Sequence, residues 1–356
     1  MRIAFGGGGT GGHVVPALAI ALQLRAMGHD AFFIGNSASI EERLSKAEGF
    51  AFFTIKVKKL YRAGILQNIL FPYYLFYSII TSIRILIKQR PDAVFCTGGF
   101  VSGPVAIASL LLHIPLFGHE SNSYPGLVTR ALARFFTCIF ISFDASRKYL
   151  SHAKISNHGI PILPKKGGSF NLDTVGLDAG KSIILVSGGS QGSLAINKAV
   201  DMALEQIIGL GYQVIWQTGK HSFSQFSHKY NTLNGLYMFD FSPMLPVMLD
   251  HVRIAITRAG ALTIAELEEK HIPAILIPLP TAAENHQFHN AVAQKEKGVA
   301  YLLEQNKLDS NALVNAIQHI DTNYELYQSA FKLLPPNNAA SDIASDIIKT
   351  LQTRTR

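Results

Sequence analysis

The sequence predicts an α/β protein of two Rossmann-like domains, each with a parallel sheet covered by helices on both faces. Short β-branched or aromatic runs alternate with helical patterns in both halves of the chain, which is typical of parallel sheets. The alternation restarts at Lys181 after a stretch rich in Pro and Gly. The length of 356 residues also exceeds the size at which one hydrophobic core usually stops growing.

In the first half, strands are expected at residues 2–5, 31–34, 93–96, 115–118 and 138–141. Pro16 suits a first helical turn, and Gly28 is placed to end the same helix. Ser39 and Glu42 have the spacing of a capping box, which predicts a second helix start.

In the second half, strands are expected at residues 183–186, 213–216, 237–239, 253–256 and 274–277. Residues 160–180 have the composition of a linker, with the hinge close to Pro161. The expected organisation is therefore an N-terminal domain at 1–160, a C-terminal domain at 161–336 and a last helix within 337–356. We expect that helix to pack back on the N-terminal domain.

Both halves open with a strand, a glycine-rich loop and a helix start. The loops cover residues 6–12 and 188–192, called loop 1 and loop 2 below. Backbone N–H groups at such a helix N-terminus suit a phosphate or another anion. Because α/β ligands lie beyond the carboxyl ends of strands, two facing sheets would place both loops at one cleft. This cleft is the expected active site.

Bulk composition narrows the class of protein. Apolar residues make up 48% of the chain and the net charge is +8, so the protein is folded and favours an acidic partner. Nucleic acid is not expected, because no RNA-binding or zinc-finger signature is present. Cys96 and Cys138 lie in apolar runs, and the N-terminus lacks the pattern of a signal peptide, which together predict a reducing, cytoplasmic location.

The uncharged segment at residues 63–83 is long enough to span a bilayer. Its polar residues, among them Gln67, Asn68 and Pro72, argue against spanning. The alternatives are a buried helix and an aromatic helix that rests on an anionic membrane surface. Basic residues flank the segment on both sides, including Lys58 and Lys88.

Two glycine-containing stretches partly match the motifs of dinucleotide-binding and P-loop proteins, but each lacks a feature that the motif requires. Gly6, Gly8 and Gly11 match the dinucleotide fingerprint, but residues 31–36 end without the acidic ribose partner. Residues 180–182 resemble part of a P-loop, yet they precede a strand instead of following one. An oxidoreductase is therefore disfavoured.

No metal site is expected. Glu284, His286 and His289 could gather on one helical side, but no further ligands define a site. The chain also lacks an Asp-x-Asp triplet, with which one family of sugar transferases holds a metal on the diphosphate. Helix N-termini and side-chain donors would then stabilise the charge on the leaving diphosphate.

Several ordered motifs resemble the MurG family of bacterial cell-wall enzymes over nearly the whole chain. They are Gly8-Gly9-Thr10-Gly11-Gly12-His13-Val14, Thr97-Gly98-Gly99-Phe100-Val101-Ser102-Gly103-Pro104, His119-Glu120-Ser121-Asn122, Gly188-Gly189-Ser190-Gln191-Gly192, Arg258-Ala259-Gly260-Ala261-Leu262-Thr263-Ile264-Ala265-Glu266 and His286-Gln287. The family transfers N-acetylglucosamine from its UDP form to the undecaprenyl-linked muramyl peptide called lipid I.

The resemblance implies a GT-B fold and an inverting transferase that makes lipid II for peptidoglycan, a step needed for cell shape and division. It implies UDP-N-acetylglucosamine as donor, no tightly bound cofactor, and a peripheral position on the cytoplasmic face of the inner membrane. Partners would be lipid I, anionic lipid and other cell-wall or division proteins. The alternatives are another GT-B glycosyltransferase, a UDP-N-acetylglucosamine 2-epimerase and a non-catalytic nucleotide-binding protein.

The resemblance also implies roles for individual residues. Ser190 would lie near the diphosphate and Ser242 beside the uracil, while Gln287, after His286, would hold sugar hydroxyls. The diphosphate and ribose would be bound by Ala261, Leu262, Thr263, Ile264, Ala265 and Glu266. The first domain would close the donor site with Thr10, Gly11, Gly12 and Asn122.

Inversion needs a base that takes the proton from the acceptor hydroxyl. His13 is the first candidate, since imidazole titrates near neutral pH; alternatively, it only hydrogen-bonds the loop or contacts the acceptor diphosphate. Glu120 is the rival base, with loop stabilisation as its alternative role. Arg258 would either face phosphate or pair within its domain.

Two positions depart from the family pattern. Leu163 stands where relatives usually have an arginine that reaches the donor, and Ser121 where glutamine is common. Lys165 or Lys166 would replace the positive charge of that arginine, but lysine lacks the planar guanidinium fork. A family with a membrane-bound acceptor also favours the interfacial interpretation of residues 63–83 over the buried one.

Overall fold

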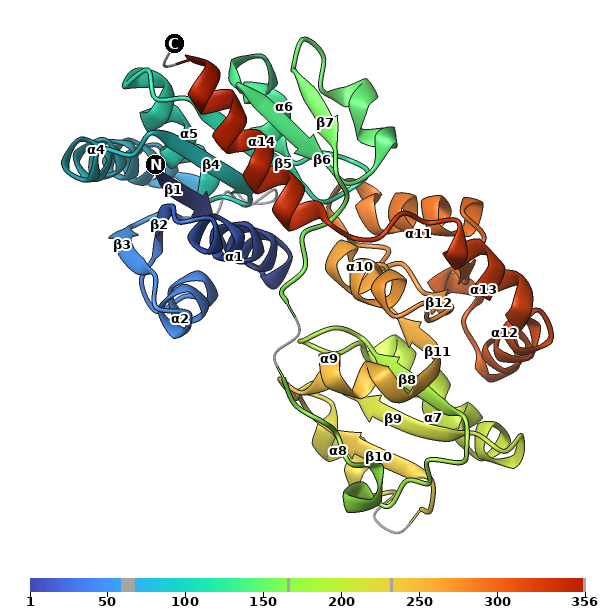
Figure 1. Cartoon of the computed structure of the whole chain (residues 1–356). Coiled ribbons are helices and arrows are strands. Elements are labelled where there is room, and N and C mark those ends of the chain that lie inside the picture. The colour runs from blue at the N-terminus through green and yellow to red at the C-terminus, as the bar shows by residue number, and fades with distance from the viewer. Residues whose placement is uncertain (59–67, 165–166, 231–232, 355–356) are drawn as a thin grey trace. The chain divides into compact units, whose positions relative to one another are not determined.

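The computed structural model describes residues 1–58, 68–164, 167–230 and 233–354, and the chain forms two compact units (Figure 1). The first unit comprises Met1–Pro164 and Asn337–Arg356, and the second comprises Lys165–Pro336. The chain therefore crosses between the units twice. The first crossing lies a few residues beyond the expected boundary at residue 160.

Among the described residues, the first unit has a parallel seven-stranded sheet with the order β3-β2-β1-β4-β5-β6-β7. The strands are β1 (Arg2–Gly7), β2 (Asp30–Asn36), β3 (Ala51–Ile55), β4 (Ala93–Gly98), β5 (Leu116–Glu120), β6 (Cys138–Ile141) and β7 (Ile155–Asn157). All strands expected in this half are present, and the edge strands β3 and β7 are additional. The strand order reverses between β1 and β4, which is where α/β sheets bind ligands.

The main helices of the first unit are α1 (Gly11–Ala26), α2 (Ile40–Ala47), α4 (Phe71–Gln89), α5 (Ser102–Leu111), α6 (Leu127–Leu132) and α14 (Ala339–Arg354). The expected start of α1 at Pro16 is wrong, because the helix begins at Gly11 and contains Pro16. The carbonyl of Thr10 accepts from the N–H groups of His13 and Val14, which starts the helix directly at loop 1. Gly28 ends the helix as expected, with φ of 81°.

A row of phenylalanine rings forms the core on one face of this sheet. Phe5 contacts Phe33 and Phe95 at ring-centroid distances of 5.2 and 5.4 Å, and Phe140 extends the row to Phe117. The helices α1 and α14 pack against each other, and both contribute to this core. The apolar stripe of α14 that joins it consists of Ile343, Ala344, Ile347, Ile348 and Leu351. The last helix is therefore an integral part of the first unit.

Within the described residues, the second unit has a six-stranded sheet with the order β10-β9-β8-β11-β12-β13, and each neighbouring pair is parallel. Its strands are β8 (Ile183–Ser187), β9 (Gln213–Gln217), β10 (Leu236–Phe239), β11 (Val252–Thr257), β12 (Ala274–Leu276) and β13 (Ala300–Leu302). The expected strands are present, and β13 is additional. The order reverses between β8 and β11.

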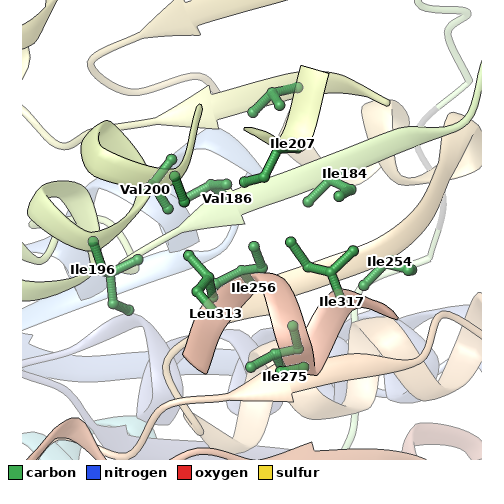
Figure 2. Close-up of a cluster of buried hydrophobic side chains, with 14 of the residues drawn as sticks. Ile184, Val186, Ile196, Val200, Ile207, Ile254, Ile256, Ile275, Leu313 and Ile317 are labelled. Carbon is green, nitrogen blue, oxygen red and sulfur yellow. The ribbon is translucent and has the colours of Figure 1, made fainter. Parts of the chain in front are cut away.

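The helices of the second unit are α7 (Leu194–Gly209), α8 (Phe223–Ser227), α9 (Leu245–Met248), α10 (Ala261–Glu269), α11 (His286–Glu296), α12 (Ser310–Thr322) and α13 (Tyr324–Lys332). Figure 2 shows side chains of β8, β11 and β12 pointing toward those of α7 and α12. Leu172 and Leu177 are buried in the core of the opposite face. The expected linker at 160–180 is therefore too long, since its second part already belongs to this unit.

None of the helices that the structure describes combines the length and hydropathy needed to cross a bilayer. Residues 63–67 of the uncharged segment lie outside the described residues. From Asn68 onward the segment leads into α4, which is joined to the unit by close packing against α5.

The docking of α14 leads to a stability prediction. Replacing the fully buried Ile347 with Ala should destabilise the first unit by about 2–5 kcal/mol, because the truncation leaves a cavity in the core. Urea denaturation followed by circular dichroism measures the change. Lys349→Ala, on the exposed side of the same helix, is the control and should have little effect; equal losses in both variants would contradict the packing.

Candidate active site

A cavity of about 600 Å³ opens at the carboxyl end of β8 in the second unit. Its lining consists of residues 187–195 together with Arg258, Gly260, Thr263, Leu279, Pro280, Thr281, Gln287 and Gln305. The cavity thus lies at the β8–β11 reversal, and its volume is in the range of small-molecule sites. Loop 2 forms a large part of its wall.

The shape of loop 2 requires glycine at two positions. A Cβ atom on Gly188 would collide with the backbone of Gly192 and Ser193, and one on Gly192 would collide with Thr218 and Gly219. Gly192 also has a φ of 78°, in the region that favours glycine. Close backbone packing therefore maintains the turn before α7.

Two helix N-termini border the cavity. Ser193 caps α7 by accepting from the N–H of Ile196 at 3.4 Å, and Leu194 of the first turn lines the cavity. At α10, the capping position is Gly260, which has no side chain to accept from the first-turn N–H groups. The positive ends of two helix dipoles therefore face one cavity, an arrangement that suits a diphosphate.

Arg258 lines the cavity, but its guanidinium is engaged within the second unit. It donates to the carbonyls of Ile277 and Pro278, to Ser193 Oγ at 2.7 Å and to Gln305 Oε1 at 2.6 Å. Burial lowers the pKa of Arg258 to about 10, so the group stays charged at neutral pH. These contacts favour pairing within the domain: Arg258 connects the cap of α7 to the end of β12.

Within the predicted segment 261–266, only Thr263 lines the cavity. Ala261, Ile264 and Ala265 are buried in the domain, so only their backbone atoms are suited to ligand contact. Burial raises the pKa of Glu266 to about 7, because it disfavours the charged form. Near neutral pH this carboxyl group is therefore able to donate a hydrogen bond as well as accept one.

The other predicted donor residues fall into two groups. Ser190 and Gln287 line the cavity, and the Oε1 atom of Gln287 accepts from the N–H of Leu279 at 3.0 Å. This bond orients the amide, and the NH₂ group remains the donor for a ligand. Ser242 and His286 are outside the cavity lining; Ser242 Oγ accepts from the N–H of Met244 at 3.1 Å.

Sequence reasoning missed Gln305 and Thr281, which also line the cavity. Gln305 starts a short 3-10 turn after β13, and Thr281 follows Pro280 in a loop. Neither stands in a motif, so no pattern in the sequence marks them. The bond from Arg258 to Gln305 explains why this turn lies at the cavity.

In the first unit, loop 1 leads directly to His13 on the first turn of α1. The Nδ1 atom of His13 lies 2.9 Å from the carbonyl oxygen of Thr97. A carbonyl only accepts, so Nδ1 carries the proton and Nε2 is the basic nitrogen of the neutral ring. Cβ atoms at Gly98 and Gly99 would lie 3.2 Å from ring atoms of His13, so the glycine pair makes room for the imidazole.

The carboxylate of Glu120 accepts hydrogen bonds from the loop that follows it. It accepts from the N–H of Gly126 at 2.9 Å, the N–H of Asn122 at 3.1 Å and Asn122 Nδ2 at 3.3 Å. Glu120 is buried, and burial raises the pKa of its carboxyl group. These contacts favour loop stabilisation over a role as base.

The structure places the remaining predicted residues of the first unit at the ends of β1 and β5. Thr10 is the exposed residue that precedes α1, followed by Gly11 and Gly12 in its first turn. Asn122 is oriented by Glu120. Loop 1 and the loop after β5 therefore each contribute groups to the carboxyl edge of the first sheet.

Hydrogen bonds within the first unit join the segment that precedes the first crossing to the residue that follows the second. The buried His119 approaches the carbonyl of Gly159 at 3.1 Å through Nε2, and Ser121 Oγ lies 3.2 Å from its Nδ1. The next carbonyl, of Ile160, accepts from Asn337 Nδ2 at 3.1 Å. Burial lowers the pKa of His119 to about 4, so this ring is neutral.

Leu163 packs against the core of the first unit. Its side chain is thus a core contact and cannot donate to a ligand. Lys165 and Lys166, the proposed substitutes for the missing arginine, lie outside the described residues. Their role stays a prediction.

Over the described part of the chain, no group of three His, Cys, Asp or Glu side chains is arranged to hold a metal ion. Glu284 has a φ of 55° and precedes α11, whereas His286 and His289 belong to that helix. The three side chains therefore do not share one helical face.

Known proteins resemble both units. Residues 3–141 match the glycosyltransferase family 28 N-terminal domain, and residues 183–350 match the glycosyltransferase family 28 C-terminal domain. The structure is similar to the crystal structure of Acinetobacter baumannii MurG, with a TM-score of 0.76, 25% identity and coverage of 98% of this chain and 99% of that one.

Proteins with similar sequences point to the same family. A UDP-N-acetylglucosamine–N-acetylmuramyl-(pentapeptide) pyrophosphoryl-undecaprenol N-acetylglucosamine transferase from Halothermothrix orenii is 37% identical over 90% of both chains. The enzyme of the same name from Limosilactobacillus fermentum is 34% identical over 90% of this chain and 89% of its own. The chain is a UDP-sugar hexosyltransferase with the GT-B fold, and it belongs to the MurG family.

Proposed function

We propose that this chain transfers N-acetylglucosamine from UDP-N-acetylglucosamine to the 4-hydroxyl of lipid I, with inversion, to form lipid II for peptidoglycan. The cavity of the second unit carries the proposal: loop 2 and the N-termini of α7 and α10 surround a space suited to the UDP diphosphate. Relatives that are similar over nearly their whole length bear the name of this activity.

Donor binding in this proposal divides among the groups around the cavity. Ser190 and the first-turn N–H groups of α10 bind the diphosphate, and the NH₂ group of Gln287 donates to a sugar hydroxyl. Glu266 binds the ribose hydroxyls, and Ser242 contacts the uracil. Arg258 acts indirectly, because its bond to Ser193 holds the start of α7 in place.

The chemical step requires deprotonation of the acceptor hydroxyl as it attacks the anomeric carbon from the face opposite UDP. We propose that His13 Nε2 takes this proton. The hydrogen bond from Nδ1–H to the carbonyl of Thr97 fixes the tautomer and stabilises the imidazolium that forms. Glu120 supports the site by ordering the Asn122 loop.

The reaction itself is tested with defined substrates. The purified protein, given UDP-N-acetylglucosamine and a lipid I analogue without added divalent cation, should release UDP and form a β-1,4 disaccharide, detected by mass spectrometry and NMR. UDP-N-acetylmannosamine formed from the donor alone would indicate an epimerase. Donor binding with neither product would indicate a binding protein.

The base is tested separately. His13→Ala should lower kcat by about 10²–10⁴-fold at saturating substrates, since general base catalysis contributes this much, while the KM for the donor changes little. His319→Ala, an exposed histidine of α12, is the matched control. Near-normal turnover of His13→Ala would overturn the assignment.

We also propose that α4 binds the surface of the cytoplasmic membrane, where lipid I is anchored. The exposed fractions of Tyr73, Phe76 and Tyr77 are 64%, 66% and 47%, so one face of the helix presents aromatic rings to the outside. The Nζ atom of Lys58 lies 4.2 Å from the ring centroid of Tyr74, and Lys88 is in the last turn of α4. Aromatic and basic side chains together suit an anionic interface.

The side chains that the structure exposes define the test of this surface. Tyr73, Phe76 and Tyr77 replaced together by Ser should weaken binding to liposomes with anionic lipid, measured by co-sedimentation, and leave turnover of a short-chain acceptor intact. The half-buried Phe71 and Leu75 are unsuitable, because their replacement also disturbs packing. Unchanged liposome binding would contradict the proposal.

Contacts with other cell-wall or division proteins stay a prediction.

A further inference from the structure

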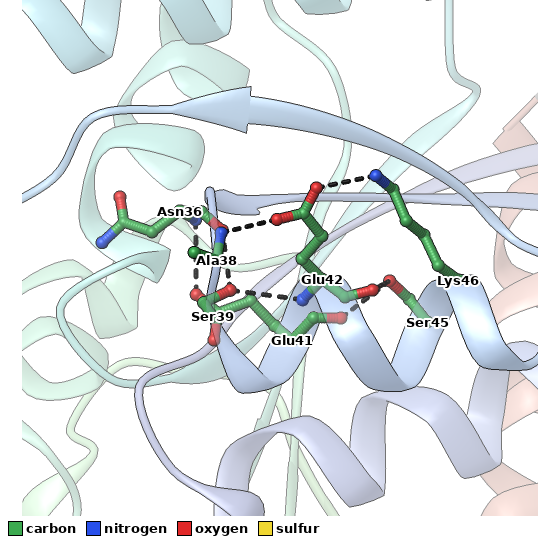
Figure 3. A network of polar contacts seen from close by, with 7 residues as sticks. All are labelled: Asn36, Ala38, Ser39, Glu41, Glu42, Ser45 and Lys46. Atoms are coloured by element: carbon green, nitrogen blue, oxygen red, sulfur yellow. Dashed lines mark hydrogen bonds and ion pairs between the residues drawn. The ribbon is translucent and has the colours of Figure 1, made fainter.

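Glu41 is a carboxylate buried beside loop 1, with 1% of its surface exposed. It lies in the first turn of α2, whose start is fixed by the predicted capping box: Glu42 N–H donates to Ser39 Oγ, and Glu42 Oε2 accepts from the N–H of Ala38 (Figure 3). The carbonyl of Glu41 accepts from Ser45 Oγ at 2.7 Å. These bonds direct Glu42 outward and Glu41 inward.

The Glu41 carboxylate connects the ends of two neighbouring strands. Its Oε2 accepts from the N–H of Gly9 at 3.2 Å, just after β1, and its Oε1 accepts from the N–H of Asn36 at 3.3 Å, at the end of β2. The side chain of Asn36 in turn pairs with both backbone groups of Val57 beyond β3. One buried charge therefore links loop 1 to a rigid part of the sheet.

Two glycines make room for this carboxylate. A Cβ atom on Gly8 would lie 2.5 Å from Cδ of Glu41, and one on Gly35 would lie 2.7 Å from its Cγ. Gly9 itself has a φ of 87°, a conformation that favours glycine. The shape of loop 1 and the Glu41 side chain are thus complementary.

Loop 1 and loop 2 therefore differ in what their N–H groups bind. In loop 2, the N–H of Gly189 donates to Ser187 Oγ and that of Gly192 to the carbonyl of Gly189, and the loop lines the cavity. In loop 1, the N–H of Gly9 donates to an anion supplied by the protein. A buried carboxylate accepting backbone N–H groups is a strong, charge-assisted contact, so it fixes the loop before any substrate binds.

We propose that Glu41 is a positioning residue for the transfer reaction: its carboxylate is an internal ligand of loop 1 that holds Gly9, and through Thr10 the start of α1, in the productive geometry. Glu41 does not touch substrate. The inference rests on the transferase activity, but it does not depend on which side chain is the base.

Glu41→Gln tests the charge at nearly constant shape. In either orientation of the amide, an NH₂ group faces the N–H of Gly9 or of Asn36, so one contact becomes repulsive. We expect kcat to fall about 10–100-fold, the effect of a displacement near 1 Å, with the KM for UDP-N-acetylglucosamine nearly unchanged. Glu42→Gln is the control on the same helix, and wild-type turnover on the same substrates verifies the reaction.

Glu41→Ala provides a second measurement. The substitution removes the atoms of one acetate ion, so added sodium acetate should raise kcat of Glu41→Ala several-fold, whereas sodium chloride at equal ionic strength should not. Glu205→Ala removes an exposed carboxylate of α7 and is the control; its kcat should not respond to acetate. The proposal is overturned if folded Glu41→Gln keeps wild-type kcat, if its loss is entirely in the donor KM, or if acetate raises kcat of Glu41→Ala no more than sodium chloride does.

Discussion

Backbone against backbone contact at the strand ends is the constraint on which both glycine loops depend. Gly192 packs on the turn of Thr218 and Gly219, and Gly99 packs on the carbonyl of Gly8. A side chain at any of these positions would separate two adjacent strand ends. The loops are consequently supported by the sheet as well as by their own sequence, and the helix that follows each loop starts at a fixed point.

That constraint explains why much of the fold was predictable. The buried strands β1 and β8 contain the apolar runs at residues 3–5 and 183–186, each close before glycines, and both features are visible in the sequence. The edge strands β3 and β7 are short and partly exposed, so they carry no strong pattern. The start of α1 was misplaced because Pro16 is typical of a first turn, whereas the Thr10 carbonyl starts the helix earlier.

Among the predicted donor residues, Ser190 and Gln287 line the cavity, and Ser190 belongs to the glycine motif that directly follows β8. The role of a side chain was harder to predict where the side chain forms hydrogen bonds with other groups of the protein. Arg258 occurs in a motif, but its partners Ser193 and Gln305 lie far from it in the sequence. Glu120 also occurs in a motif, and it binds N–H groups of its own loop. Glu41 carried no signal, since an acidic residue in a first helical turn is ordinarily solvent-facing.

The junction of Ile160 with Asn337 has a consequence for biosynthesis. The second unit is an insertion between β7 and α14, and the core of the first unit includes the apolar stripe of α14. During synthesis, the residues of α14 are therefore added only after the whole second unit. The core of the N-terminal unit is therefore completed last, although most of its residues are synthesised first.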